Sequence, residues 1–172
     1  KTALVIGGSG GIGGEVCLQL AKDGFNIALH YHSNVDRAIE LKKIIEEQGV
    51  KCIIIKANLN IESELKGMFD LIQRSFDTIN VLVNAAASNI PNIKFQDLEW
   101  ADYLNQLELN IKSVFNIMKF IVELMVNSGG GKIINIGGDH SMAIATIADT
   151  LNKYPNAKVV YFDAHADINT YK

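Results

Sequence analysis

Short runs rich in Val and Ile alternate with longer amphipathic segments along the whole chain, and this alternation limits the possible folds more than any other feature. Such runs are typical of strands buried on both faces of a parallel sheet, with each amphipathic segment forming a helix between them. The predicted strands are residues 3–6, 26–30, 52–56, 81–84, 132–136 and 159–162, and the predicted helices lie near residues 11–23, 34–48, 62–76, 97–127 (broken) and 141–153.

Right-handed crossovers between parallel strands would place the six strands in the order 3-2-1-4-5-6. The fold class expected is therefore α/β, a three-layer αβα, Rossmann-like, doubly wound parallel sheet. A chain of 172 residues that is 48% hydrophobic can bury one sizeable core, so we expect a single domain over residues 1–172.

Charge and cysteine content exclude several classes of partner. The chain has 16 Lys and Arg against 19 Asp and Glu, a net charge of −3 without a basic block, which argues against nucleic acid. Cys17 and Cys52 lie in apolar surroundings, as core thiols do in a reducing cytosol. No apolar run reaches the ~18 residues of a membrane span. We expect a cytoplasmic protein without membrane contact, and the oligomeric state stays open.

A glycine-rich loop joins the first strand to the first helix, with the sequence Gly7-Gly8-Ser9-Gly10-Gly11-Ile12-Gly13-Gly14. Without Cβ atoms, the backbone N–H groups and the helix N-terminus are open to a pyrophosphate. The loop therefore predicts nucleotide binding. The alternative is a tight turn that needs glycine only for positive φ.

The loop after the second strand reads His30-Tyr31-His32-Ser33-Asn34. It has no acidic residue to hold a ribose diol, and its polar side chains would tolerate a 2′-phosphate, which favours NADP over NAD. The alternative is an ordinary solvated loop with two surface histidines.

Four motifs together resemble the short-chain dehydrogenase/reductase family over residues 1–136. They are the glycine spacing, the strand end Val83-Asn84-Ala85-Ala86, the helix segment around Asn110, and the fifth strand ending at Ile136. The resemblance implies a dinucleotide site and a remnant of a catalytic tetrad at Asn110. The implied cofactor-binding residues are Gly7, Ser9, Gly11, Ile12, Gly13, His32, Asn58, Leu59, Asn84 and Ala85.

Several positions depart from that family's pattern. Ile6 replaces the usual Thr before the glycine loop and offers no hydrogen bond to brace it, Asn58 replaces an adenine-contacting Asp, and Ala85 and Ala87 replace an Asn and a Gly. Asn58 still has an amide oxygen that can accept a hydrogen bond. We expect these departures to weaken dinucleotide binding rather than abolish it.

The catalytic residues that the resemblance calls for are not found in their usual form. The family uses a Ser just past the fifth strand and a Tyr followed four residues later by a Lys. Here Gly137-Gly138 follow Ile136, and the one Tyr and Lys at that spacing, Tyr154 and Lys158, have Pro155 between them, which would interrupt a continuous helix. The sequence therefore predicts no dehydrogenase catalysis.

Residues 137–172 resemble the arginase and ureohydrolase family in two motifs, Gly-Gly-Asp-His-Ser at 137–141 and Asp-Ala-His-Ala-Asp-Ile-Asn-Thr at 163–170. This resemblance implies metal ligands at His140, Asp163, His165 and Asp167, and a substrate contact at Asn169. It implies weak binding of Mn²⁺ or a similar ion. The alternative is that these residues only cap strand ends.

Together the two resemblances suggest an engineered chimera, a dehydrogenase-like fragment over 1–136 joined to an arginase-like fragment over 137–172. We expect no enzyme activity, and weak binding of NADP or NAD. The alternatives are a functional NADP-binding module and a Mn-type metal-binding protein with a residual hydrolase-like site.

Overall fold

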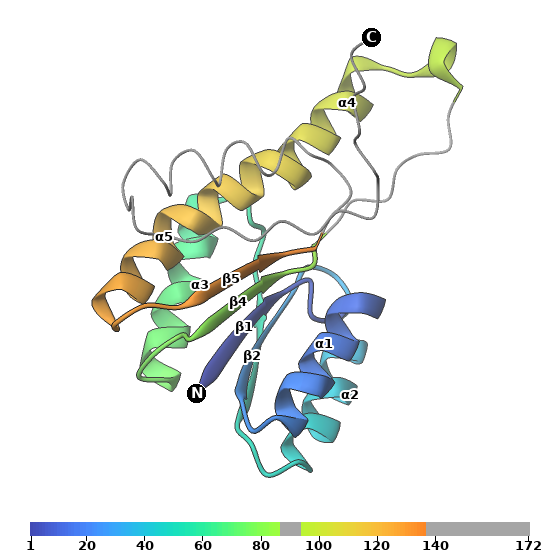
Figure 1. The fold of residues 1–172 in the computed structure, drawn as a ribbon. Coiled ribbons are helices and arrows are strands. Elements are labelled where there is room, and N and C mark those ends of the chain that lie inside the picture. The colour runs from blue at the N-terminus through green and yellow to red at the C-terminus, as the bar shows by residue number, and fades with distance from the viewer. Residues whose placement is uncertain (87–93, 137–172) are drawn as a thin grey trace, which may run out of the picture.

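A five-stranded parallel sheet forms the centre of the computed structural model, which describes residues 1–86 and 94–136. The order β3-β2-β1-β4-β5 confirms the predicted α/β topology for these strands (Figure 1). The predicted sixth strand at 159–162 and the helix at 141–153 lie outside the described residues. The strands are β1 (Thr2–Ile6), β2 (Asn26–Tyr31), β3 (Cys52–Lys56), β4 (Val81–Asn84) and β5 (Lys132–Asn135).

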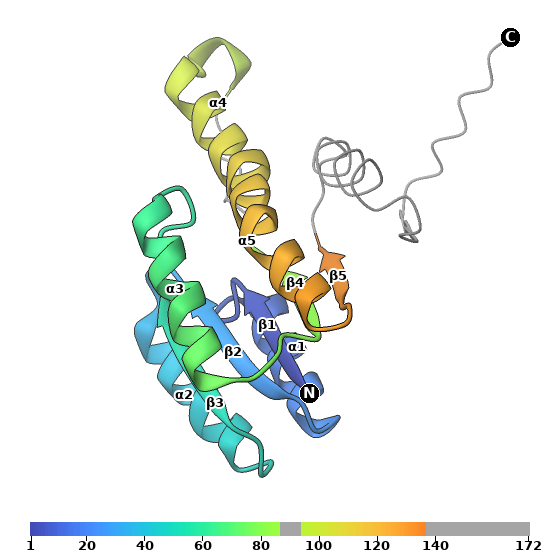
Figure 2. The ribbon, with the colours of Figure 1, turned by 90° about the vertical axis from the view of Figure 1, so that its left-hand side faces the viewer.

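The helices begin and end within a few residues of their predicted positions. They are α1 (Gly11–Lys22), α2 (Val35–Glu46), α3 (Glu62–Ser75), α4 (Trp100–Leu107) and α5 (Ser113–Asn127), with a short 3₁₀ turn at Phe95–Asp97. Helices α1 and α2 cover one face of the sheet, and α3 and α5 cover the other (Figures 1 and 2). No helix in the described ranges has the length and apolarity needed to cross a bilayer.

Each face of the sheet has its own hydrophobic core because side chains alternate along a strand. On β1, Leu4 and Ile6 join the core under α3 and α5, while Ala3 and Val5 join the core under α1 and α2. All five residues of β1 are buried, as expected for a central strand covered on both faces.

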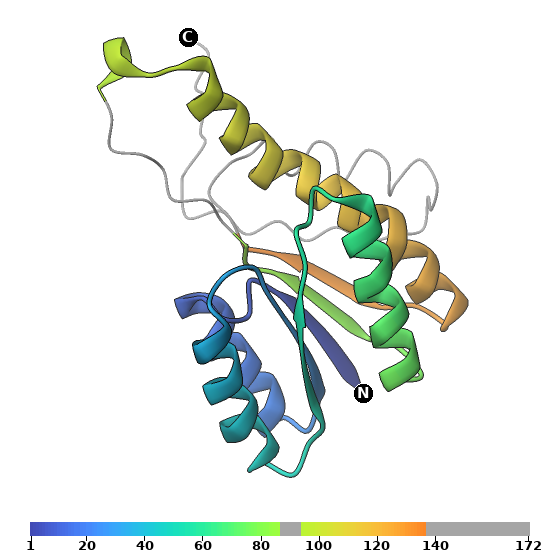
Figure 3. The same ribbon diagram turned by 180° about the vertical axis from the view of Figure 1, so that it is seen from behind.

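Parallel pairing brings the carboxyl ends of the strands to one edge of the sheet. Val5 pairs with Leu29 and with Val83, so the loops that follow β1, β2 and β4 start side by side (Figure 3). In open α/β sheets this edge is where ligands bind. The glycine loop lies on it.

The predicted break in the long fourth helix takes the form of a π-helical segment, Glu108–Lys112, between α4 and α5. The three elements form one continuous rod (Figure 1). Single π-helical turns are often found at functional sites.

Candidate functional site

The glycine loop folds back on itself between β1 and α1. Gly7 has a φ of +74°, which favours glycine, and its carbonyl oxygen accepts a hydrogen bond from Gly10 N–H at 2.9 Å. Gly8 N–H donates to the carbonyl oxygen of His30 at 2.8 Å, which ties the loop to the end of β2.

Two of the glycines are required by close backbone approach. A Cβ on Gly13 would lie 2.2 Å from the carbonyl oxygen of Gly7, and a Cβ on Gly7 would lie 2.9 Å from Ala86 N. By contrast, a Cβ on Gly11 would meet no atom within 4 Å. Gly11 thus faces open space and is not required by close packing within the described residues.

Helix α1 begins with its backbone donors uncapped. Its N-cap is Gly10, which makes no side-chain cap, and its first turn has no acidic residue. Ile12, in this first turn, is 63% exposed. Free N–H groups and the positive end of the helix dipole suit an anion, so this end of α1 fits a phosphate.

His30 braces the glycine loop, a role that the sequence prediction missed. The residue is 2% exposed, its Nδ1 accepts a hydrogen bond from Gly7 N–H at 3.2 Å, and its Nε2–H donates to the carbonyl oxygen of Ala57 at 2.9 Å. Burial lowers the pKa of His30, against the opposing effect of the Ala57 bond. Ile6 cannot donate or accept a hydrogen bond that would brace the glycine loop, and His30 of β2 supplies such a bond instead.

The alternative interpretation of the loop after β2 expected two surface histidines. It is correct for His32 and wrong for His30. His32 is exposed on the loop, whereas His30 shares a face of β2 with the buried Ala28. Side chains alternate between the two faces of a strand, and this alternation could have predicted that His30 is buried. No carboxylate occurs between the end of β2 and Asn34, whose side chain caps α2 through Arg37 N–H at 3.2 Å.

The loop after β3 is held by its own hydrogen bonds. The Asn58 side-chain oxygen accepts from Asn60 N–H at 3.0 Å, and Asn58 N–H donates to Glu64 Oε2 at 2.7 Å. The carbonyl oxygen of the buried Leu59 accepts from Asn116 Nδ2 of α5 at 3.1 Å. The amide oxygen that we expected to accept from a ligand already holds one bond within the loop.

Asn84 ends β4 with an unused donor. It is 2% exposed, its side-chain oxygen accepts from Ala86 N–H at 3.4 Å, and its Nδ2 has no hydrogen-bond partner among the described residues. Ala85 N–H donates to the carbonyl oxygen of Ile6 at 2.9 Å, so Ala85 keeps its place through the backbone. A buried donor without a partner costs about 1–3 kcal/mol, which fits a position completed by a bound group.

Asn110 lies in the π-helical segment rather than in regular helix. It is half-buried, and its Nδ2 donates to Gln106 Oε1 at 3.2 Å. The helix is thus irregular at the residue that the family resemblance singled out.

The structure therefore brings the dinucleotide candidates together at one edge of the sheet. The metal candidates His140, Asp163, His165 and Asp167, together with Asn169, lie outside the described residues, and their arrangement stays a prediction. Within residues 1–86 and 94–136, no group of His, Cys, Asp or Glu side chains is arranged to hold a metal ion.

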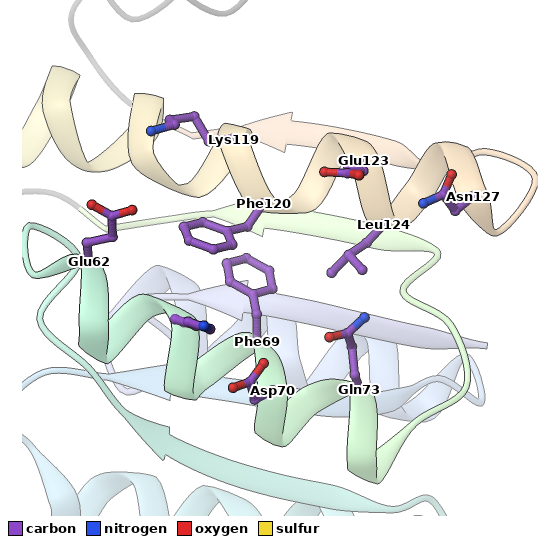
Figure 4. A pocket seen from close by; sticks show the side chains of 10 residues that line it. Glu62, Phe69, Asp70, Gln73, Lys119, Phe120, Glu123, Leu124 and Asn127 are labelled. Atoms are coloured by element: carbon purple, nitrogen blue, oxygen red, sulfur yellow. The ribbon is translucent and has the colours of Figure 1, made fainter.

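A separate groove of about 540 Å³ lies between α3 and α5 (Figure 4). Phe69 and Phe120 stack across it with ring centroids 5.2 Å apart, and side chains of both charges, including Asp70 and Lys119, surround them. The groove lies between helix faces, and none of its lining residues is a dinucleotide candidate, so it is not part of that site.

Comparison with known proteins identifies the family. The model of the short chain dehydrogenase family matches residues 1–159. The chain belongs to this family.

Among curated proteins, the chain is 35% identical over 138 residues to the 3-oxoacyl-(acyl-carrier-protein) reductase FabG of Staphylococcus epidermidis, with 79% of this chain and 55% of the relative covered. It is 28% identical over 141 residues to glucose 1-dehydrogenase 2 of Bacillus subtilis, with 81% and 55% covered. The chain thus spans about half the length of these relatives.

Among solved structures, acetoin dehydrogenase from Enterobacter cloacae is similar, with a TM-score of 0.72 at 27% identity over 86% of this chain and 62% of that one. A dehydrogenase from Burkholderia cenocepacia, solved with bound NADP, has a TM-score of 0.64 at 25% identity over 69% of this chain and 46% of that one.

These findings overturn the expectation of a non-catalytic chimera. The family match runs across the expected join at residue 137 and on to residue 159, so it gives no support to a ureohydrolase segment. The relatives are oxidoreductases, and the prediction that the chain is not an enzyme is wrong. The metal-dependent hydrolase alternative is wrong for the same reason. Tyr154 and Lys158 lie within the residues that the family model matches and outside the described residues, so their role stays open.

Proposed function

We propose that the chain forms the nucleotide-binding part of an NADP-dependent oxidoreductase that reduces a carbonyl group. The observation that carries the proposal is the uncapped N-terminus of α1 beside a glycine loop whose shape requires Gly7 and Gly13. An anion at this point gains backbone hydrogen bonds and the helix dipole without displacing a side chain.

The proposed contacts divide along the sheet edge. Gly7, Ser9, Gly11, Ile12 and Gly13 would hold the pyrophosphate, and His32 would lie near the adenosine ribose. The remaining contacts would come from Asn58, Leu59, Asn84 and Ala85.

NADP is favoured over NAD by the loop after β2. His32 is exposed there. That loop has no carboxylate that would bind the ribose diol of NAD or repel the 2′-phosphate of NADP. The bound NADP in the Burkholderia cenocepacia dehydrogenase supports this choice of cofactor. We also propose a cytoplasmic location for the chain.

When bound at the glycine loop, NADPH would supply the hydride for reduction of a substrate carbonyl. The developing oxyanion must then receive a proton from the protein. Tyr154 and Lys158 have the family's spacing and lie within the matched residues, so we propose them as the proton-donating pair. The similarity to the Staphylococcus epidermidis reductase makes a 3-oxoacyl thioester the first substrate to test.

The test is NADPH oxidation, followed by absorbance, with a 3-oxoacyl thioester and with acetoin. Turnover above the rate without enzyme is expected. The Tyr154→Phe variant should lose turnover by about 10²-fold or more while NADPH binding is unchanged. Turnover that survives in Tyr154→Phe would exclude this proton donor. Absence of turnover together with normal NADPH binding would restrict the function of this chain to binding.

A further inference from the structure

His30 lies between two loops that the proposed function assigns to the dinucleotide. One is the glycine loop, which begins at Gly7, and the other is the loop after β3, in which Ala57 precedes Asn58 and Leu59. The His30 ring joins them through Nδ1 to Gly7 N–H at 3.2 Å and through Nε2 to the Ala57 carbonyl oxygen at 2.9 Å. The His30 side chain therefore links the glycine loop, proposed to bind the pyrophosphate, to the loop after β3, proposed to bind another part of the dinucleotide.

These two hydrogen bonds fix the state of the ring. The Gly7 backbone nitrogen can only donate, and the Ala57 carbonyl oxygen can only accept. Both bonds form only when the imidazole is neutral with its proton on Nε2. A doubly protonated ring would present N–H to N–H at Gly7, so it could not hold the glycine loop in this position.

The surroundings of His30 favour that neutral state. Its face of the sheet is lined by apolar side chains, among them Ile6 of β1 and Ile55 of β3. Burial lowers the pKa of His30 first of all, the Ala57 bond opposes this, and the nearby His32 lowers it further. Glu64, the first-turn carboxylate of α3 that reaches this region, already accepts a hydrogen bond from Asn58 N–H.

We propose that His30 is a positioning residue that holds the glycine loop ready for the dinucleotide and releases it when protonated, so that affinity for NADP and NAD falls together in acid. This inference rests on the proposed function. It adds a pH dependence that comes from the protein and not from the phosphate groups of the ligand.

His32 could also make NADP affinity depend on pH, but its effect would have the opposite sign to that of His30. A protonated His32 would attract a 2′-phosphate and so would strengthen NADP binding in acid, with little effect on NAD. The 2′-phosphate also takes up a proton near pH 6, as phosphate monoesters do. A parallel fall for NAD, which lacks that group, therefore separates His30 from both effects.

The experiment is calorimetric titration of the full chain with NADP and with NAD in steps from pH 8.0 to pH 5.0, with circular dichroism at each pH to verify folding. Loss of a backbone hydrogen bond in a buried site predicts at least about a fivefold fall in affinity for both ligands. The same NAD affinity across this range would contradict the inference and leave the proposed function intact. Absence of binding at pH 8.0 would contradict the proposed function and this inference with it.

Three variants assign the effect to one nitrogen. His30→Asn places an amide oxygen near the position of Nδ1 and does not titrate, so it should bind NAD within a fewfold of the parent at pH 8.0 and show no acid loss. His30→Gln reaches towards Ala57 without an acceptor for Gly7 and should bind weakly at every pH. The control His32→Asn should keep the acid loss with NAD. An acid loss that persists in His30→Asn would contradict the inference.

A measurement without ligand tests the same geometry. Nitrogen-15 chemical shifts of the His30 ring should show a proton on Nε2 and an unprotonated Nδ1 at pH 8.0. The opposite tautomer would contradict the inference whatever the binding data show.

Discussion

Single residues in the glycine loop have separable roles, because internal packing requires some glycines and leaves another free. Gly13 meets the carbonyl oxygen of Gly7, whereas Gly11 faces open space. The sequence pattern predicts both as dinucleotide contacts without this distinction. The difference depends on how closely α1 approaches the preceding turn, which a spacing of glycines alone does not reveal.

The matched variants Gly13→Ala and Gly11→Ala test this distinction. Gly13→Ala should lower the free energy of unfolding by about 1–3 kcal/mol, because the loop must move away from the new Cβ. Gly11→Ala should leave thermal stability unchanged or raise it slightly, since Ala favours helix by up to about 1 kcal/mol, while it lowers NADP affinity. Thermal unfolding and calorimetry measure the two effects. A stable Gly13→Ala protein would contradict the geometry of the loop.

His30 also predicts a pH dependence of stability, independent of any ligand. Its pKa in the folded state lies below the ordinary value of about 6.5. The unfolded chain therefore binds more protons in acid, so the stabilisation is complete above about pH 6.5 and is lost as the pH falls towards the folded-state pKa.

Urea unfolding at pH 7.5 and pH 5.5 measures this loss of stability. The parent should lose more stability in acid than His30→Asn does, and His32→Asn should behave as the parent does. An equal loss in the parent and in His30→Asn would assign the acid sensitivity to other groups.

Among the elements, helices and strands were predicted more closely than the details of their ends. Val81–Asn84 and Cys52–Lys56 match the predicted strands, because each contains a short unbroken apolar run bounded by polar residues. The π-helical turn at Asn110 was anticipated only as a break. Its hydrogen-bond pattern depends on packing that periodicity does not describe.

The exposed first turn of α1 offers a test of where the phosphate binds. Ile12→Glu places a carboxylate at an exposed position beside the positive end of the helix, which should stabilise the free protein by about 0.3–1 kcal/mol. The same charge should repel a phosphate and weaken NADP binding by about tenfold or more. Ile12→Gln is the neutral control and should bind nearly as the parent does. Equal NADP affinities of the Glu and Gln variants would show that the phosphate is not bound at this end of α1.

At the scale of the whole molecule, the strand order was predictable because right-handed crossovers leave few arrangements for alternating strands and helices. The function was not predicted correctly. The motifs after residue 136 were interpreted as part of a second protein, whereas the family match continues to residue 159. Within the candidate site, Gly7, Gly13 and Asn84 were predicted from local patterns, and the structure places them at the same edge of the sheet. His30 was missed because its role depends on two loops that only the fold brings together.

The proposed function requires that a dinucleotide binds at the edge formed by the glycine loop. Calorimetric titration of the full chain with NADP at pH 8.0 tests it most directly, with Ile12→Glu and Gly13→Ala as matched variants. We expect saturable binding with one site per chain, tighter for NADP than for NAD, and reduced in both variants. No heat with millimolar NADP or NAD, from a chain that circular dichroism shows to be folded, would contradict it.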